Sequence, residues 1–487
     1  MKNTTTNPKE CQQKPAKSKE SIVIDEADKN NCISATERFF SRFKVLDIMN
    51  ECGAYKEKGV PVSVILMYVF TLMFSPISMY FQIKTRSYRE TFCKNTVYRF
   101  LENVHMNWQL FLLKLAKAVI CDVRSLTDGG KRYSLIVDDT PLSKRGKRME
   151  LVCRYFNHVD MRNENGYRIL TVAWTDGVTT LPVMYTLLSS SNDDLVRGYI
   201  KEGLDGRSLA ARIRKMARTP ATDLTIKFVK QVKNAGIKAD FVLFDSWFTG
   251  YRLITTIVKE AGMTVISRVK TESNQYFELN GKQMTLKQIY CSCTKRRGKA
   301  KWKLSVTVNL LCRKNKKIIG RLPVKLVFVP NRAKNDEYIC ILCTDTEMGE
   351  DDIRKQYAKR WQIEVMFKSC KQYLKLGKDF QCTSFEAQNA QIAICYARYM
   401  MIALERREEV DQRSFGEIFW LLNQEMADIS LGTAMMILVS LFKKGLKEVL
   451  HLPEESIQKM LDYVTNQLPD YLSRTLKLVN GVDVVSA

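Results

Sequence analysis

The chain has 487 residues, which at roughly 150 residues per domain suggests about three domains. Hydrophobic residues make up 45% of it, enough to bury a sizeable core, and this excludes wholesale disorder. Lys and Arg total 77 against 52 Asp and Glu, which gives a formal net charge of +25. An excess of this size implies a polyanionic partner. Nucleic acid is the first candidate, ahead of an anionic membrane surface or merely solvated charge.

Cysteine usage and uncharged segments bear on the compartment. Fourteen cysteines are scattered along the chain, and Met1–Glu20 is polar, without the apolar core of a secretory signal. This pattern is typical of free thiols in a reducing compartment, so we expect a cytoplasmic protein. Residues 59–82 carry no charge but contain Pro61 and Pro76. They predict a buried helix pair rather than a membrane span, and no membrane partner is expected.

The first 125 residues divide into a tail and a helical region. Residues 1–35 are rich in Lys, Asn and Thr and are expected to be disordered. Over residues 36–125 the apolar residues recur at helical spacing. In residues 87–103 the polar positions include Lys94 and Arg99. This segment fits either the DNA-facing helix of a helix-turn-helix, with both cations toward DNA, or an ordinary amphipathic helix.

Residues 126–269 have the pattern of a mixed α/β core. The run Tyr133–Val137 predicts a strand that ends where Asp138 and Asp139 begin, and Phe241–Phe244 predicts a buried strand that ends at Asp245. The other predicted elements are a hairpin of Tyr167–Trp174 and Leu181–Leu188, a basic helix over residues 207–218, and a helix from about Thr222 to Gly236. The acids of this core therefore stand at strand ends.

Residues 270–336 change to Lys-rich strands and turns, which predict a small antiparallel β domain inserted into the core. Asn280-Gly281 is a strong hairpin signal there. The run Lys295–Lys303 is either a solvated turn or a surface that follows a DNA backbone. Its basic residues are Lys295, Arg296, Arg297, Lys299, Lys301 and Lys303. Trp302 fits either a base-stacking role or the core of this domain. The α/β core resumes over residues 337–383, and residues 384–487 predict a C-terminal helical region.

The segment from about residue 351 to residue 374 predicts one long helix. Five of its polar residues lie on one side, with four of them within roughly 60° of one another at about 100° per residue. These are Tyr357, Arg360, Glu364 and Lys371, joined by Lys368. A carboxylate among cations suits an anionic substrate, because Glu364 would hold a metal ion and the cations would hold phosphates. The alternative is a solvated helix with intrahelical ion pairs such as Arg360 with Glu364.

Three carboxylates brought together by the fold would form a two-metal site. Asp138 or Asp139, Asp245 and Glu364 are the candidates, and such a set can hold two divalent ions about 3.5–4 Å apart. These ions activate an attacking oxygen and stabilise the leaving one in phosphoryl transfer. The chain has only 3 histidines, spaced far apart. Carboxylates would therefore be the main ligands, which favours two Mg²⁺ ions, with Mn²⁺ able to substitute, over zinc.

The string from Tyr357 to Lys371, spaced Y-x2-R-x3-E-x6-K, resembles the signature of a group of bacterial insertion-sequence transposases of the DDE class. The resemblance covers about residues 90–445. In that family the first Asp lies on the first strand of a ribonuclease-H-like fold, the second follows the fourth strand, and the Glu lies on a helix after an inserted β domain. The resemblance therefore implies a ribonuclease-H-like mixed sheet with an inserted β domain, flanked here by helical regions.

The resemblance also implies roles for single residues. Family members commonly carry Ser or Thr two residues after the first acid, which fits Asp138 and Thr140 and leaves Asp139 as the alternative. Adjacent strand residues point to opposite faces, so only one of the two acids can face the metals. Tyr357, Arg360 and Lys371 would contact phosphates near the cleaved end without reading sequence.

The function that follows is a transposase that binds the terminal inverted repeats of its element, cuts the DNA there and transfers the ends to target DNA. Two ends handled together imply a homodimer, and double-stranded DNA in the nucleoid is the expected partner. Two alternatives share the basic surface. One is a structure-specific nuclease of the same fold, and the other is a non-catalytic DNA-binding derivative, against which the three intact acids argue.

Overall fold

A computed structural model gives the structure of the chain. It describes residues 34–475 except for residues 57, 87, 89, 91, 127–130, 147, 158–159, 273–274, 299, 315–316, 332–336, 409–412, 470 and 474. The described chain forms two compact units, one over residues 38–421 and the other from the residues up to 37 together with those from 422 onward. The tail predicted for residues 1–35 lies, apart from its last two residues, outside the described part, and so does Lys299.

The helical region predicted after residue 36 is present. Its elements are α1 (Ala35–Arg42), α2 (Val45–Met49), η3 (Asn50–Ala54), α3 (Val62–Thr71), η4 (Leu72–Phe74), α4 (Met79–Lys84), α5 (Lys94–Leu101) and α6 (Trp108–Ser125). The uncharged run 59–82 forms the expected helix pair, α3 and α4, of which α3 is the more buried. The helix predicted over residues 87–103 is shorter. It begins at Lys94, because Cys93 before it has an extended backbone.

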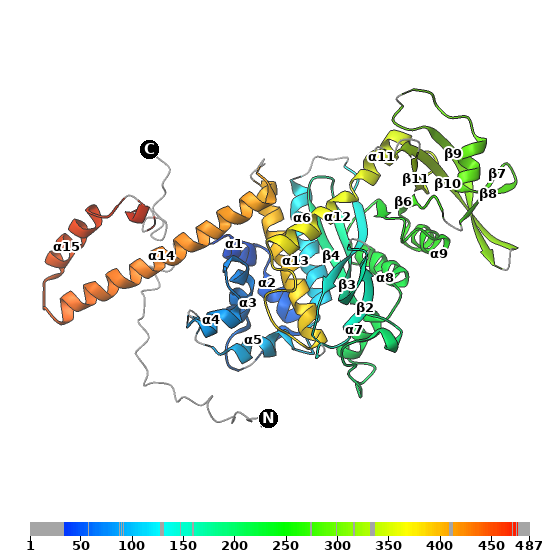
Figure 1. Ribbon diagram of the computed structural model, residues 1–487. Coiled ribbons are helices and arrows are strands. Elements are labelled where there is room, and N and C mark those ends of the chain that lie inside the picture. Colours follow the sequence, from blue (N-terminus) through cyan, green and yellow to red (C-terminus); the bar gives the residue numbers. More distant parts are fainter. Residues whose placement is uncertain are drawn as a thin grey trace. The chain divides into compact units, whose positions relative to one another are not determined.

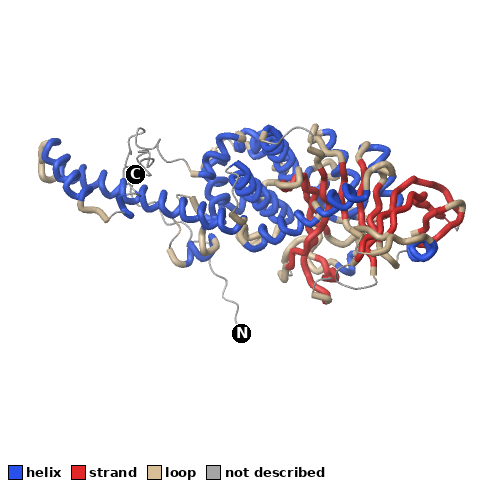
Figure 2. The backbone as a smooth tube through the Cα atoms, turned by 90° about the horizontal axis from the view of Figure 1, so that it is seen from above, coloured by secondary structure: helices blue, strands red, loops and turns tan. Residues whose placement is uncertain are grey.

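Within the part of the chain that the structure describes, eleven strands form one mixed sheet. Figure 1 labels most of these strands, and Figure 2 shows the strands gathered in one part of the molecule. They are β1 (Ser134–Ser143), β2 (Cys153–Asn157), β3 (Arg162–Thr175), β4 (Thr180–Leu188), β5 (Phe241–Phe244), β6 (Thr264–Val269), β7 (Tyr276–Leu279), β8 (Lys282–Thr285), β9 (Leu304–Lys314), β10 (Lys317–Pro330) and β11 (Tyr338–Cys343). Their order is β2-β3-β1-β5-β6-β11-β10-β9-β7-β8, with β4 beside β3. Strands β1, β5 and β6 are parallel, and the other pairs are antiparallel. A mixed α/β sheet of this kind is consistent with a ribonuclease-H-like fold.

The strand that carries the first acids is longer than predicted. The sequence pattern ends it at Val137, but β1 continues through Asp138 and Asp139 to Ser143. The reason is its antiparallel partner β3, which pairs with β1 along the whole length from Ser134↔Thr175 to Ser143↔Gly166. Only the parallel partner β5 ends early, at Phe244 opposite Val137. The point where the apolar run gives way to Asp138 and Asp139 therefore marks the end of the parallel pairing with β5 rather than the end of β1.

The segment predicted as an inserted β domain supplies β7 to β10. The Asn280-Gly281 hairpin between β7 and β8 is confirmed, and both of its residues have positive φ, 50° and 75°, as this tight turn requires. Strand β10 also pairs with β11 and so joins these strands edge to edge with the core sheet. They belong to the same compact unit as the core. Their standing as a separate inserted domain remains a prediction.

Helices cover the core strands. They are α7 (Leu209–Ala217), α8 (Ala221–Asn234), α9 (Tyr251–Thr256), α11 (Glu350–Ala358), α12 (Trp361–Gln372) and α13 (Phe385–Glu408); shorter elements are η5 (Asp193–Leu195), η6 (Ile257–Ala261) and α10 (Leu286–Ser292). Helices α6 and α13 pack against β4, and so do α7 and α8 (Figure 1). Every residue of β4 is buried, so both of its faces are covered.

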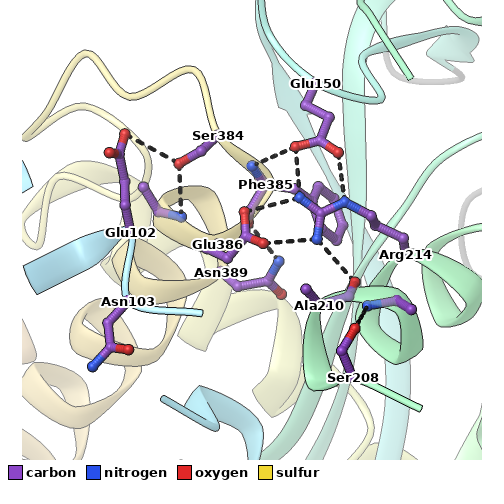
Figure 3. Close-up of polar contacts among 12 residues, drawn as sticks. Glu102, Asn103, Glu150, Ser208, Ala210, Arg214, Ser384, Phe385, Glu386 and Asn389 are labelled. Carbon is purple, nitrogen blue, oxygen red and sulfur yellow. Dashed lines mark hydrogen bonds and ion pairs between the residues drawn. The ribbon is translucent and has the colours of Figure 1, made fainter. Parts of the chain in front are cut away.

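A buried ion cluster joins three distant segments of this core (Figure 3). Arg214 of α7 donates from Nε to Glu150 at 2.5 Å and from Nη1 to Glu386 at 2.7 Å. Glu150 lies in the loop that follows β1, and Glu386 lies in the first turn of α13. Glu150 also accepts from the backbone N–H of Phe385 at 3.2 Å. One guanidinium thus ties α7 and the start of α13 to the loop after the acid-bearing strand.

The C-terminal region is helical, as predicted, and ends in α14 (Phe415–Glu448) and α15 (Glu454–Asn466). Within the second unit, Lys443 and Lys447 pair with Glu454 at 2.9 and 3.3 Å, which joins the end of α14 to the start of α15. Among the described helices α14 is long and apolar enough to cross a membrane by length and composition, and few residues of its apolar stretch are buried.

Candidate active site

Two of the predicted acids lie side by side at one edge of the parallel strands. Strands β1 and β5 pair in parallel with Val137 opposite Phe244, so the next residues, Asp138 and Asp245, leave the paired region at the same level. Paired residues of adjacent strands point to the same face of a sheet. The charge of Asp245 raises the pKa of Asp138, in keeping with the proximity that this register gives the two carboxylates.

The third acid reaches this edge on α12. The long helix predicted over residues 351–374 is divided into α11 and α12, and the backbone tightens between them. The N–H groups of Lys359, Arg360, Gln362 and Ile363 each donate three residues back rather than four. A turn of this kind is a 3₁₀ segment, which rotates the side chains on either side of it relative to a regular helix. The helical wheel drawn for the four signature residues is therefore distorted at Arg360.

Arg360 joins two of the acids. Its Nη1 donates to Asp138 at 3.3 Å and its Nη2 donates to Glu364 at 2.6 Å. Arg360 is thus a bridge between β1 and α12, and the i,i+4 ion pair with Glu364 anticipated as an alternative is present as well. Arg360 makes the intrahelical pair with Glu364 and the contact to Asp138 at the same time. The presence of the ion pair therefore does not mean that this face of the helix is merely exposed to solvent.

The carboxyl group of Asp138 titrates abnormally. Burial raises its pKa to about 7, against the lowering effects of the Asp139 backbone N–H and of Arg360, while Asp139 and Asp245 raise it further. Burial is the largest of these causes, and Arg360 offsets it only in part. A cation bound at this half-buried carboxylate would favour its charged form.

Asp139 points elsewhere. Its carboxylate pairs with Arg168 of β3 rather than with Arg360. Adjacent positions on one strand face opposite sides of the sheet, as expected. This geometry supports Asp138 over Asp139 as the acid of the site, although both remain close enough for their charges to interact.

The other signature residues surround the acids. Lys371 donates from Nζ to the hydroxyl of Thr140 at 2.7 Å, which ties the end of α12 to β1. Burial raises the pKa of Tyr357 to about 12; the charges of Arg360 and Arg268 lower it and that of Asp245 raises it. Tyr357 therefore lies near the second acid. Lys368 is exposed on the same helix, and none of the described contacts joins it to the acids.

The remaining predicted DNA-binding residues lie outside this cluster. Lys94 and Arg99 are exposed on α5, and Arg99 lines a hollow of about 390 Å³ with Tyr55 and Lys56. Lys295, Arg296 and Arg297 are exposed in the segment before β9. The guanidinium of Arg296 lies 3.5 Å from the ring centroid of Trp302, which is half-buried.

The donor set fits a hard divalent cation in its chemistry. Among the described residues no three carboxylate, imidazole or thiol groups lie close enough to form a ready-made metal site. Asp138 and Asp245 are nevertheless adjacent, and Glu364 is held next to Asp138 through Arg360. Oxygen ligands without histidine suit Mg²⁺ or Mn²⁺. Full coordination would require Arg360 to release at least one of its two carboxylates.

Three cations of this edge were not predicted from the sequence. Arg168 pairs with Asp139, Arg268 acts on Tyr357, and Lys270 follows β6 directly. The positions of Arg268 and Lys270 could have been predicted from the sequence, because β6 runs parallel to β5 and ends at the same edge as Asp245. Arg168 is opposite Pro141 in the antiparallel β1–β3 register, which no local pattern reveals.

Comparison with known proteins indicates the class of this domain. A family model described as a DDE superfamily endonuclease matches residues 82–299, which include Asp138 and Asp245. A second model, described as a transposase DDE domain, matches residues 204–401, which include Asp245 and Glu364. No curated protein matches the chain. Domains of this kind act on DNA and generally depend on divalent metal ions. The two matches together span residues 82–401, and both support a transposase of the DDE class.

Proposed function

We propose that this protein is a cut-and-paste transposase that binds the terminal inverted repeats of an insertion sequence, cleaves its ends and transfers them to target DNA. The observation that carries the proposal is the arrangement of Asp138 and Asp245 at one sheet edge, with Arg360 linking Asp138 to Glu364. The spacing Y-x2-R-x3-E-x6-K further supports membership of the subgroup that carries this signature.

Asp138, Asp245 and Glu364 are the residues that would hold the metal, with Asp139 as the alternative first acid. Two Mg²⁺ ions, for which Mn²⁺ can substitute, would supply activation of the attacking oxygen and stabilisation of the leaving oxygen. Asp138 must lose its proton to act as a ligand, and its pKa of about 7 makes this loss sensitive to pH. Water would attack first to free a 3′-hydroxyl, and that hydroxyl would then attack the target strand in the same site.

The cations around the acids would hold the DNA backbone. Tyr357, Arg360 and Lys371 lie at the acids and would contact phosphates near the cleaved bond, where such contacts position DNA without reading its sequence. Lys368 would join them from the exposed side of α12. The anchoring of Lys371 on Thr140 supports a fixed position for its ammonium group beside the site.

Further contacts would come from outside the site. We assign Lys94 and Arg99 of α5 and the basic run of Lys295, Arg296, Arg297 and Lys299 to the double-stranded DNA of the element ends, with Trp302 as a further contact. Two ends must be processed together, so the active form would be a homodimer. The substrate places the protein in the bacterial cytoplasm, at the nucleoid, with no membrane partner.

Substitution of the acids tests this proposal. Glu364→Gln and Asp245→Asn should abolish Mg²⁺-dependent cleavage of DNA carrying the element ends, measured on duplexes from the regions flanking the coding sequence. Binding of the same duplexes should remain within a few-fold of wild type, because the phosphate contacts come from other residues. Glu260→Gln is the matched control, since Glu260 forms an exposed ion pair with Lys230. Cleavage by Glu364→Gln at the wild-type rate would refute the assignment.

The match to a DDE superfamily endonuclease supports one second candidate, a structure-specific nuclease that uses the same acids. The two functions differ in the second step. A transposase joins the cleaved 3′-end covalently to a target duplex, whereas a nuclease releases it. Recovery of joined products in a strand-transfer assay supports the transposase, and cleavage of branched DNA without joining supports the nuclease.

A further inference from the structure

Gln362 fastens the start of α12 to the turn between β3 and β4. Its side-chain N–H donates to the carbonyl of Gly177 at 2.7 Å, and its amide oxygen lies 2.6 Å from the hydroxyl of Thr175 and 2.9 Å from that of Thr180. Both threonines are buried. The carbonyl of Gly177 can only accept a hydrogen bond, so the orientation of the amide is fixed. Gln362 therefore has one defined position on this turn.

The turn that receives Gln362 is itself well anchored. The buried carboxylate of Asp176 pairs with Arg407 of α13 at 3.1 Å and accepts from the backbone N–H groups two and three residues further on, at 2.9 and 2.7 Å. Gly177 has a φ of 98°, and a Cβ there would lie 3.1 Å from Cε of Lys359, whose stem packs over it. The turn thus holds the chain at Lys359 and again at Gln362.

Both of these contacts fall where the backbone between α11 and α12 is tightened. The N–H groups of Lys359 and Gln362 each donate three residues back. A 3₁₀ segment turns about 120° per residue, against about 100° in an α-helix, and its hydrogen bonds have poorer geometry. A contact from outside the helix keeps such a segment from relaxing to the α form. Arg360, which lies between the two anchored residues, is directed at Asp138 and Glu364.

We propose that Gln362 is a positioning residue for DNA cleavage. By binding the β3–β4 turn it holds the tightened segment and so aims Arg360 at the two acids that this arginine bridges. Gln362 itself contacts neither DNA nor a metal ion and acts through Arg360. The other end of α12 is fixed independently, by the hydrogen bond of Lys371 to β1. This inference rests on the proposed function, because it takes the three acids to be the site of cleavage.

Replacement of Gln362 by methionine in the full chain tests this role. Gln362→Met keeps an unbranched side chain of the same length and removes its hydrogen bonds. With end duplexes from the regions flanking the coding sequence, the single-turnover cleavage rate at saturating DNA and Mg²⁺ should fall by about 10- to 100-fold, the effect of a misplacement of about 1 Å. Binding of the same duplexes in Ca²⁺ should stay within about three-fold, since Arg360 is one of several phosphate contacts. Gln231→Met is the matched control, because Gln231 is exposed on α8.

The turn offers an independent pair of variants. Thr180→Val removes a hydroxyl that donates to Gln362 and keeps the shape of the buried side chain, whereas Thr180→Ser keeps the hydroxyl. The valine variant should lower the single-turnover rate by about 2- to 10-fold, the size of one net hydrogen bond, and the serine variant should restore most of it. A role in packing alone would give the reverse ranking, since serine loses a buried methyl group and valine does not.

A double variant tests whether Gln362 acts through Arg360. In an Arg360→Lys background, Gln362→Met should have little further effect on the rate, because changes to residues that act on one another are not additive. All variants are compared at a temperature at which circular dichroism shows them folded. Cleavage by Gln362→Met at the wild-type rate, a reversed ranking of the Thr180 variants, or rate effects that multiply in the double variant would overturn the positioning role and leave the transposase intact. Cleavage by Glu364→Gln at the wild-type rate would instead overturn the proposed function and the positioning role with it.

Discussion

The buried cluster around Arg214 supports a quantitative prediction about stability. The Arg214 guanidinium makes four hydrogen bonds to two carboxylates, to Glu150 at 2.5 and 2.8 Å and to Glu386 at 2.7 and 2.9 Å. Arg214→Met keeps an unbranched apolar stem and removes the guanidinium with its charge. Two buried carboxylates are then left without their cation. Breaking a buried pair in this way costs about 3–5 kcal/mol, and we expect a loss of this size in the free energy of unfolding at pH 7.

The free energy of unfolding should depend on pH differently in wild type and in Arg214→Met. Burial raises the pKa of Glu386, but the hydrogen bonds and charge of Arg214 lower it more, so the folded pKa lies below the ordinary value. In wild type the stabilisation is therefore present above that ordinary value and is lost as pH falls through the folded pKa. In Arg214→Met the lowering effects of Arg214 are lost, and burial, the largest cause, raises the pKa of Glu386 against the smaller lowering effects of its own backbone N–H and of Lys201. The variant should gain stability as pH falls from 7 toward 5, where wild type changes little.

Urea unfolding followed by circular dichroism at pH 5 and pH 7 measures both effects. Lys230→Met is the control, because it breaks the pair with Glu260, whose partners are 47% and 49% exposed, and exposed pairs contribute at most about 1 kcal/mol. The cluster does not anchor the core if the free energy of unfolding of Arg214→Met at pH 7 lies within about 1 kcal/mol of the wild-type value, which is approximately the uncertainty of such extrapolations. The same conclusion follows if the stability of the variant does not increase toward pH 5.

Three further predictions concern the site and the basic surface. Asp138→Asn should be folded and inactive in end cleavage, whereas Asp139→Asn should keep activity and lose about 1 kcal/mol of stability or less; the reverse result would exchange the two acids. At limiting Mg²⁺ the cleavage rate should rise as pH increases through about 7, because protonated Asp138 cannot bind the ion. Excess Mg²⁺ should shift the midpoint of this rise to lower pH, and a midpoint independent of Mg²⁺ would contradict the prediction. Neutralising the basic residues of the run 295–303 should reduce the dependence of DNA affinity on salt, and an unchanged slope would identify the run as a solvated turn.

The acid-bearing strands were predictable because they are local patterns. The runs before Asp138 and Asp245 are apolar and short, and the structure places both in the parallel part of the sheet. No local pattern could predict that the two acids lie beside each other. They depend on the register Val137↔Phe244, which is formed by chain segments more than 100 residues apart. What the sequence could supply was the expectation that strand ends gather at one edge of a sheet.

The helix with the signature residues shows the opposite case. Its existence and its polar side follow from spacing, yet the spacing assumes one regular helix through Arg360. The structure tightens the backbone there into three-residue hydrogen bonds, and no glycine or proline marks the position. Arg360 can reach Asp138 because that tightening is combined with the packing of α12 on β1. Neither contribution is visible in a helical wheel, so the bridge between Asp138 and Glu364 could not be predicted.

The distribution of charge explains why binding and cleavage should be separable by mutation. The acids repel phosphates and can act only when cations compensate them, whereas Lys371, Arg268 and Lys270 attract phosphates whether or not the acids are occupied. Arg360 belongs to both groups, since it holds two acids in this structure and carries the charge that a phosphate would bind. Isosteric amides at the acids therefore remove cleavage and leave the attraction for DNA in place. A change at Arg360 should instead affect both properties, because it alters the balance of charge between the acids and the DNA backbone.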